Sequence, residues 1–537
     1  MFLVDAAQVK LENYKNDLKN FIREYHAYMF LAFIGGVIIH AGVMIYNIGN
    51  GDTVKWAVYQ YDFTHERASG RWMLQYISML RNYKVIPIFD TLIAIGCLSI
   101  AAIIIIDCLR IKSTIYRALF SIILLSSPFV NFYLYIYYTS DAYCLGFLLA
   151  TIAAMLVING KKWKSIILAA FIMMTSLAIY QAMINIFVLT CVICVFKNAF
   201  ECEKPVKEQS KLLLRLFGCA IISIILYLIS IKASFLIHGG QLMHYKGLDE
   251  MGRYTPELVI QMAKTYFRYL RLLYFVPNDS VSASFYYSKV FNGSVINIYI
   301  CAIIIVACTY FFVRNIYPKG KAYVLWSVVC SIILLFGFGA VIFASSTFSF
   351  DSSSINSLIS PQFCLLYGLC FALLDVMHTP HSREIWLRTC VAVCGILLCY
   401  NLILALNEAY YGNELAWKEQ HSIAQRIVDR IEQTEGWHEG IRLAIIGGFT
   451  SQISNNYPNI YEEEIRCSNM PYMWEHQTQV GWNHYLNVYF GINYEMVSED
   501  EMENIASKDE VKNRPSFPDK DSVFIHDGVM VVKLRDS

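Results

Sequence analysis

The chain has 537 residues, of which 56% are hydrophobic, 15% are aromatic and only 16% are charged. Soluble domains carry about 25% charged residues, so this composition excludes an ordinary soluble enzyme. The formal net charge of +1 gives no reason to expect a nucleic-acid partner. Repeated apolar runs near the length that crosses a bilayer predict a polytopic α-helical protein of the cell membrane.

About eleven membrane-spanning helices are predicted from these runs. They lie near residues 27–46, 85–107, 119–137, 143–159, 165–180, 183–200, 212–232, 295–313, 322–345, 361–378 and 386–406. Lysine and arginine gather in alternate connections, such as 161–164 and 197–215, whereas the hairpins around Ser140, Gln181 and Ser353 hold none. By the positive-inside rule the N-terminus is cytoplasmic, and an odd number of spans places the C-terminus on the extracytoplasmic side.

The spans divide the chain into three predicted parts. Residues 1–26 form a cytoplasmic tail, 27–406 form the membrane domain and 407–537 form an extracytoplasmic domain. Two outer loops of the membrane domain, 47–84 and 233–294, are too long to be simple connections. We therefore expect function in these loops and in the C-terminal segment.

The C-terminal segment has the pattern of a small α/β domain. Ile423, Ile427 and Ile431 share one helical face after Asn413, and "IRLAIIGGF" predicts a buried strand. The stretch "SVFIHDGVMVV" predicts a hairpin that turns at Asp527 and the following glycine. The segment has no Walker loop, dinucleotide fingerprint or zinc spacing, so no cofactor is predicted.

The first outer loop carries an acid and an arginine that suit chemistry at a membrane surface. Asp52 follows the first span closely, where a carboxylate is far cheaper than at the bilayer centre, although a solvated loop acid is the alternative. Further on, Trp72, Tyr76 and Leu80 share one face of a predicted amphipathic helix in the headgroup layer. Arg71, at the edge of that helix, could bind a phosphate with two guanidinium nitrogens.

Two short outer hairpins supply further candidates. Asp141, in "YYTSDAYCLG", is interpreted either as a catalytic acid or as the N-cap of the fourth span, and Ser140 could also provide that cap. Tyr180 and Gln181, in "LAIYQAMIN", are interpreted either as sugar contacts or as a polar helix cap. Both pairs of interpretations remain open at this point.

The second outer loop contains a predicted basic helix. Thr255 and Pro256 are a typical helix start, and Arg268 and Arg271 follow at helical spacing among aromatic residues. These arginines are predicted to bind a lipid phosphate, unless their stems only cover an apolar surface. Lys289, in "FYYSKVF", is a further candidate of this kind.

A divalent metal is possible but unsupported by the sequence. His238 and His244 lie in one loop with Asp249 nearby, yet they do not form a tight ligand pattern. We therefore predict no metal site.

An acid after the first span, "GRW" at 70–72, "TSDAY" at 139–143 and "SLAIYQA" at 176–182 together resemble the type II serotype-converting glucosyltransferase family. The resemblance is clearest over residues 45–190. It implies the polytopic membrane architecture called type C. It also implies that the protein moves a hexose, usually glucose, from a polyprenyl-phosphate donor to a hydroxyl of a surface glycan such as an O-antigen.

The resemblance also implies roles for individual residues. Asp52 stands where the key acid is expected, and its role would be that of a general base for the acceptor hydroxyl. Arg71 matches the family motif and would neutralise the departing lipid phosphate, whereas Arg268 and Arg271 are assigned to this task from the helix pattern alone. In one departure from type C enzymes, which often have a second acid beside the first, Asp52 is followed by Thr53.

Two other functions stay open. A lipid-linked glycan polymerase or ligase would use a similar donor on the same side of the membrane, but would depend on residues 233–294 rather than on Asp52. A transporter or flippase would need ionisable residues along a path through the spans. Here Asp90, Asp107 and Asp375 lie near span ends, which favours an enzyme.

Overall fold

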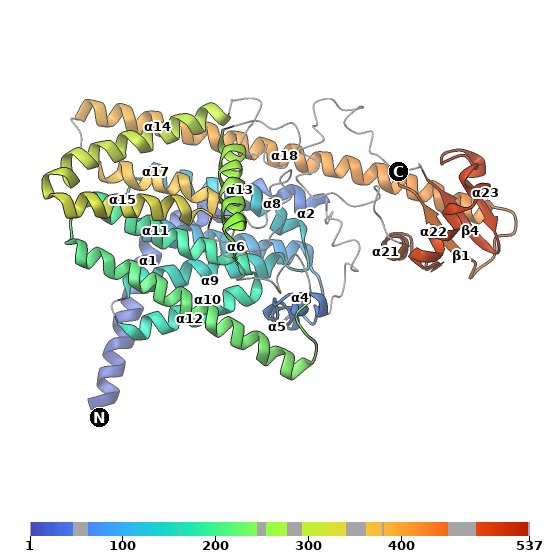
Figure 1. Cartoon of the computed structure of the whole chain (residues 1–537), viewed down its shortest axis with the longest axis horizontal. Coiled ribbons are helices and arrows are strands. Elements are labelled where there is room, and N and C mark those ends of the chain that lie inside the picture. The colour runs from blue at the N-terminus through green and yellow to red at the C-terminus, as the bar shows by residue number, and fades with distance from the viewer. Residues whose placement is uncertain are drawn as a thin grey trace.

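The computed structural model describes residues 2–46, 63–160, 162–243, 254–275, 293–339, 361–377, 381–448 and 479–534. Within them, long apolar helices form a bundle, and a small α/β unit lies at the far end of the last helix (Figure 1). Seven helices of the described residues are long and apolar enough to cross a membrane, or up to eight if a bent pair is one span. Shorter apolar helices, at Trp163–Ile179, Lys321–Gly337 and Pro361–Val376, accompany them. The prediction of a polytopic helical membrane protein is therefore confirmed.

The helices follow the predicted apolar runs. The first part contains α1 (Phe2–Ile39), α2 (Ala41–Tyr46), α4 (Thr64–Ala68), α5 (Met73–Met79), α6 (Pro87–Cys108), α7 (Thr114–Leu125), α8 (Pro128–Tyr135), α9 (Ser140–Asn159), α10 (Trp163–Ile179) and η1 (Gln181–Met183). The second part contains α11 (Ile184–Glu201), α12 (Val206–His238), α13 (Pro256–Tyr274), α14 (Gly293–Phe311), α15 (Lys321–Gly337), η7 (Pro361–Cys364), α17 (Leu365–Val376) and α18 (His381–Gln433). Helix α10 packs against both α9, which precedes it in the chain, and α12, which follows α11. Each helix satisfies its own backbone hydrogen bonds, as a lipid environment requires.

Two of the predicted spans contain a break. The third, expected near 119–137, is a pair of helices, α7 and α8, bent by 45°. Pro128 has no N–H to continue the helical hydrogen bonds, and the Ser126 and Ser127 hydroxyls donate to the carbonyls of Ile122 and Ile123 instead. The first span is likewise divided, because α1 ends just before His40 and α2 begins after it.

The last helix joins the bundle to the α/β unit. The span predicted at 386–406 is only the first part of α18, which continues without a break to Gln433. Asn413, expected to precede a separate helix, lies buried in the middle of α18. Ile427 and Ile431, on the predicted apolar face, are fully buried in the core of the α/β unit.

The α/β unit has one four-stranded sheet in the order β2-β1-β4-β3. Its strands are β1 (Arg442–Ile446), β2 (Glu495–Met496), β3 (Val523–His526) and β4 (Val529–Lys533), and its helices are α21 (Gln479–Phe490), α22 (Glu499–Ser507) and α23 (Asp509–Lys512). Strand β1 is parallel to β2 and β4, whereas β3 and β4 form the predicted antiparallel hairpin. Asp527 and Gly528 have φ values of 47° and 75°, as a tight two-residue hairpin turn requires.

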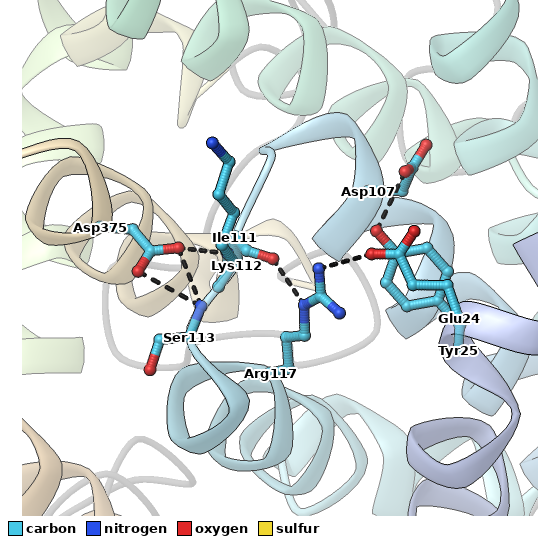
Figure 2. A network of polar contacts seen from close by, with 8 residues as sticks. All are labelled: Glu24, Tyr25, Asp107, Ile111, Lys112, Ser113, Arg117 and Asp375. Atoms are coloured by element: carbon cyan, nitrogen blue, oxygen red, sulfur yellow. Dashed lines mark hydrogen bonds and ion pairs between the residues drawn. The ribbon is translucent and has the colours of Figure 1, made fainter.

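Hydrogen bonds and an ion pair connect α7 to α1 and to α17 (Figure 2). Arg117 Nη2 lies 2.8 Å from Glu24 Oε1. The Asp375 carboxylate accepts hydrogen bonds from the backbone N–H groups of Lys112 and Ser113, and so caps α7 from a distant part of the chain. Asp375 therefore has a structural partner, which argues against an ion path through this part of the bundle.

Helix α2 approaches α18 very closely. A Cβ atom on Gly42 would lie 2.8 Å from the Cβ of Tyr410. The Tyr410 hydroxyl is hydrogen-bonded to His40 Nδ1, and His40 Nε2 lies 2.7 Å from the Leu125 carbonyl oxygen. This contact fixes the end of the first span against α7 and α18, directly before residues 47–62.

Replacing Gly42 by alanine is expected to destabilise the protein by about 1–3 kcal/mol, because the added methyl group overpacks the contact with Tyr410. Gly96→Ala is the matched control, because its new Cβ would meet only Phe33, at 3.9 Å. Thermal unfolding of the detergent-solubilised protein measures both. Equal transition midpoints for the two variants would contradict the close approach of α2 and α18.

Candidate functional site

Arg71 lies just before α5, and side chains from two other parts of the bundle surround its guanidinium group. Its Nη1 donates to the Tyr143 hydroxyl at 3.3 Å, and its Nε donates to Gln181 Oε1 at 3.4 Å. The guanidinium carbon lies 4.8 Å from the centre of the Tyr180 ring, which stacks on Tyr143. We call these four residues the Arg71 cluster. Three candidates from two separate loops, Arg71 from one and Tyr180 and Gln181 from the other, are thus brought together.

Gln181 connects this cluster to the loop that carries Arg71. Its Nε2 donates to the Ser69 carbonyl at 2.9 Å and to the Tyr227 hydroxyl at 2.8 Å, and Tyr227 donates to the Gly70 carbonyl at 3.2 Å. Gly70 has a φ of 84°, and a Cβ there would lie 2.6 Å from the Tyr227 hydroxyl oxygen. Only glycine fits this position. The Gln181 side chain therefore joins two loops, and its interpretation as a helix cap is wrong.

Arg81 forms a second cluster at the other end of α5. Its Nη1 lies 2.6 Å from Asp141 Oδ2 and 3.2 Å from Asp90 Oδ1. Its Nη2 donates to the Tyr138 carbonyl at 2.7 Å. The three charged side chains are at most 10% exposed, so they form a buried ion cluster. We call Arg81, Asp90 and Asp141 the Arg81 cluster.

Asp141 lies in the first turn of α9, one residue after the helix begins. The N-cap interpretation is wrong, because the cap residue is Thr139 and the Ser140 hydroxyl donates to the Tyr137 carbonyl. Asp141 pairs with Arg81 instead, and its position in the first turn also suits the helix dipole. Its Oδ1 is buried and has no hydrogen-bond partner among the described residues. Asp141 thus keeps an acceptor atom that its ion pair does not use.

Helix α5 lies within the segment where the amphipathic helix is predicted. It contacts α12. The Trp72 indole N–H donates to Ser230 Oγ at 3.1 Å, and the Tyr76 hydroxyl lies 2.9 Å from His238 Nε2. Leu80, one turn beyond Tyr76, is 89% exposed. An exposed apolar residue at this place suits a helix that lies at the membrane surface.

Within the described ranges, no group of three or more His, Cys, Asp or Glu side chains is arranged to hold a metal ion. His238 contacts Tyr76. Its two possible partners in a metal site, His244 and Asp249, lie outside the described residues. The described part of the chain therefore gives no support to a metal centre.

Helix α13 begins as predicted, because Thr255 caps it by accepting a hydrogen bond from the Leu258 N–H at 3.2 Å. Arg268 and Arg271 both lie on its exposed surface. The helix that carries these two arginines packs on a different group of helices from the one that surrounds Arg71.

Those helices are α14, α15 and the start of α17. The Tyr266 hydroxyl donates to the Leu335 carbonyl near the end of α15, and the Tyr274 hydroxyl donates to the Phe363 carbonyl in η7. Asn297, near the start of α14, donates to the Tyr274 carbonyl. Helix α13 therefore crosses the ends of these helices (Figure 1).

Two candidates cannot be compared with the structure. Asp52 and Lys289 both lie outside the described residues. Their roles stay predictions.

A model of the GtrII glucosyl transferase family matches residues 56–360, more than half of the chain. The chain belongs to this family. The match confirms the resemblance seen in the sequence and extends it through the second long loop. Searches of the curated proteins and of the solved structures found no significant match. As a GtrII family member, the protein is a glucosyltransferase, and the family implies action on surface glycans.

The two clusters and their surroundings include three residues that the sequence analysis did not select. Tyr143 and Tyr227 complete the surroundings of Arg71, but a tyrosine in an apolar span gives no local signal of such a contact. The sequence does contain a signal that points to Arg81. Asp90 lies inside the start of an apolar span and needs a cation to compensate its charge, and Arg81 is the arginine that precedes it most closely.

Replacing Arg81 by methionine is expected to destabilise the glucosyltransferase by about 3–5 kcal/mol, because two buried carboxylates lose their counter-charge. The triple variant Arg81→Met, Asp90→Asn, Asp141→Asn is expected to regain part of that stability. Thermal unfolding in detergent measures the effect. Lys418→Met is the control, because the ion pair of Lys418 with Glu414 is exposed on the lysine side and contributes little. A wild-type midpoint for Arg81→Met would contradict the buried cluster.

Proposed function

We propose that this glucosyltransferase takes glucose from a polyprenyl-phosphate donor embedded in membrane lipid and attaches it to a hydroxyl group of a cell-surface glycan. The reaction would take place on the extracytoplasmic side of the cell membrane. The observation that carries the proposal is the Arg71 cluster, a cation with aromatic and amide neighbours at one end of a membrane bundle. Family membership supports the glucosyl part, and the resemblance to type C enzymes supports the donor.

Arg71 is suited to the lipid phosphate. Its contacts with Tyr143 and Gln181, at 3.3 and 3.4 Å, are longer than good N–H···O hydrogen bonds, whose length is about 2.7–3.2 Å. A phosphate oxygen would form shorter, charge-assisted bonds with the same N–H groups. These shorter bonds would compensate for the loss of the contacts with Tyr143 and Gln181. The Tyr180 ring would hold the guanidinium in place during the exchange.

The chemical step is a substitution at the anomeric carbon. The acceptor hydroxyl oxygen forms a bond to this carbon, and the bond from the carbon to the phosphate oxygen breaks. Asp52 is proposed to take the proton of the hydroxyl, and polyprenyl phosphate leaves with the electron pair. The positive charge of Arg71 would stabilise the negative charge that develops on the leaving phosphate.

Asp141 is proposed as the second acid of the site. Its Oδ2 is held by Arg81, and its Oδ1 has no hydrogen-bond partner among the described residues, so it can accept a hydrogen bond from a sugar hydroxyl. Asp141 and Tyr143 lie in the same first turns of α9, and Tyr143 contacts Arg71. A glucose attached to a phosphate on Arg71 would therefore lie within the neighbourhood of Asp141.

Other residues are proposed to contact the lipid-linked donor near the end of the bundle where Arg71 lies. Trp72 keeps part of its surface exposed and is proposed to contact the donor beside Arg71. Arg268 and Arg271, exposed on α13, are proposed to bind the lipid phosphate as the donor arrives. Lys289 is proposed for the same task from the sequence alone.

The proposed orientation has the N-terminus, with residues 1–26, in the cytoplasm and residues 407–537 outside. Helix α5, which Arg71 precedes in the chain, lies toward the same end of the bundle as the α/β unit (Figure 1). The connections rich in lysine, such as 161–164 and 197–211, join helices at the opposite end. This arrangement supports a positive inner face and an outer catalytic face.

Asp52→Asn is expected to abolish the addition of glucose to the surface glycan, because an amide cannot accept the proton of the acceptor hydroxyl. The measurement is the glucose content of the glycan from cells that carry equal amounts of membrane-inserted protein. Asp62→Asn, in the same loop, is the matched control. If Asp52→Asn still added glucose normally, Asp52 would not be the general base. A changed glycan chain length, with no change in glucose branches, would instead favour a polymerase or ligase.

Arg71→Ala is expected to lower the rate of glucosyl transfer by roughly 10²-fold or more, as for other removed electrostatic groups. Arg71→Lys keeps the charge but loses the planar fork, so its rate is expected to be intermediate. The assay follows release of polyprenyl phosphate from polyprenyl-phosphate glucose by protein in detergent. Arg67→Ala is the control, because Arg67 donates to Gln75 within the same loop. If Arg71→Ala and Arg67→Ala lost the same fraction of the transfer rate, both substitutions would act by disordering the loop, and the proposed phosphate contact of Arg71 would be contradicted.

A further inference from the structure

A hollow of about 390 Å³ lies between α10 and α12, far from the Arg71 cluster. Figure 1 shows these two helices side by side along one side of the bundle. The hollow is lined by Trp163, Ile166, Ile167, Leu214, Arg215, Gly218 and Ile222. These residues lie in the first turns of α10 and in the third to fifth turns of α12, so the hollow is near the end of the bundle opposite to Arg71. We call it the α10–α12 groove.

The walls of the groove are apolar and open toward the lipid. Trp163 is 66% exposed and Leu214 is 69% exposed. At Gly218, an added Cβ would meet no atom within 4 Å, so the missing side chain widens the groove. A flat helix face would give a lipid tail only passing contacts, whereas a hollow between two helices can hold one tail along its length.

Cations surround the end of the groove where the helices leave the apolar layer. Lys207, Lys211 and Arg215 follow one another at intervals of four residues and form a stripe on α12 that leads into the groove. On the facing helix, Lys162 precedes Trp163, and both are exposed. Tryptophan and lysine in this order are typical of the layer where lipid headgroups lie.

Arg215 adds positive charge to this end, or rim, of the groove. It also joins the two helices that form the walls. Its guanidinium group donates a hydrogen bond to the Gly160 carbonyl, in the turn between α9 and α10. This contact joins the start of α10 to α12 and keeps the two walls at a fixed separation. Lys164 lies over the Trp163 ring, with its Nζ 5.9 Å from the ring centre, and adds positive charge to the same rim.

We propose that the α10–α12 groove is a binding site for an anionic phospholipid of the leaflet at this end of the bundle. One acyl chain would fill the apolar hollow against Leu214, Gly218 and Ile222. The phosphate would lie among Lys162, Lys211 and Arg215, where charge complementarity favours an anionic headgroup over a zwitterionic one. This site is independent of the proposed transfer reaction, because it lies at the opposite end of the helices from Arg71.

The test is native mass spectrometry of the full chain, purified from micelles that contain phosphatidylglycerol and phosphatidylcholine with identical acyl chains in equal amounts. The wild-type protein is expected to retain phosphatidylglycerol several-fold more often than phosphatidylcholine. The double variant Lys162→Gln, Lys211→Gln is expected to lose this preference and still retain lipid. Lys321→Gln, which removes an exposed lysine from the same end of the bundle, is the matched control and keeps the preference.

A second variant tests the hollow itself. Gly218→Leu adds an apolar side chain to the groove, where its Cβ would meet no atom within 4 Å, and is expected to lower retention of both lipids. Leu228→Phe, on an exposed part of α12 outside the groove, is its control and is expected to behave as the wild type. Equal retention of the two lipids by the wild type would overturn the proposal, and so would wild-type retention by Gly218→Leu. Neither result would affect the proposed transfer reaction, whose tests measure glucose.

Discussion

The buried ion cluster of Arg81 with Asp90 and Asp141 determines how the end of the bundle around α5 is organised. A carboxylate inside the start of a span is costly unless a cation compensates it, and here one arginine reaches two carboxylates on α6 and α9. Arg81 follows α5 directly, so its ion pairs fix one end of that short helix. The other end of α5 is then held where Arg71 meets α9 and η1.

The contacts of Arg71 differ from those of Arg81. Arg81 faces two carboxylates at short distance, and replacing them by a substrate would leave buried charges without a partner. Arg71 contacts the neutral side chains of Tyr143 and Gln181 at 3.3 and 3.4 Å, which is longer than a good N–H···O hydrogen bond. Two arginines ten residues apart thus have different tasks. One stabilises the loop, and the other presents a positive charge at its edge.

Local patterns were sufficient for the parts of the fold that depend on neighbouring residues. The apolar runs, the start of α13 at Pro256 and the hairpin turn at Asp527 all follow from short-range rules. The link between Arg81 and Asp141 spans sixty residues, and nothing in either segment specifies it. The continuity of α18 was missed because the chain becomes polar after the membrane, although a polar helix can continue when it packs on another domain.

Helix α18 also connects the α/β unit to the end of the first predicted span. Tyr410 on α18 packs on Gly42 and bonds to His40, just before the chain enters the segment with Asp52. Further along the same helix, Ile427 is buried in the core of the α/β unit. A displacement of α18 would therefore act on both regions at once.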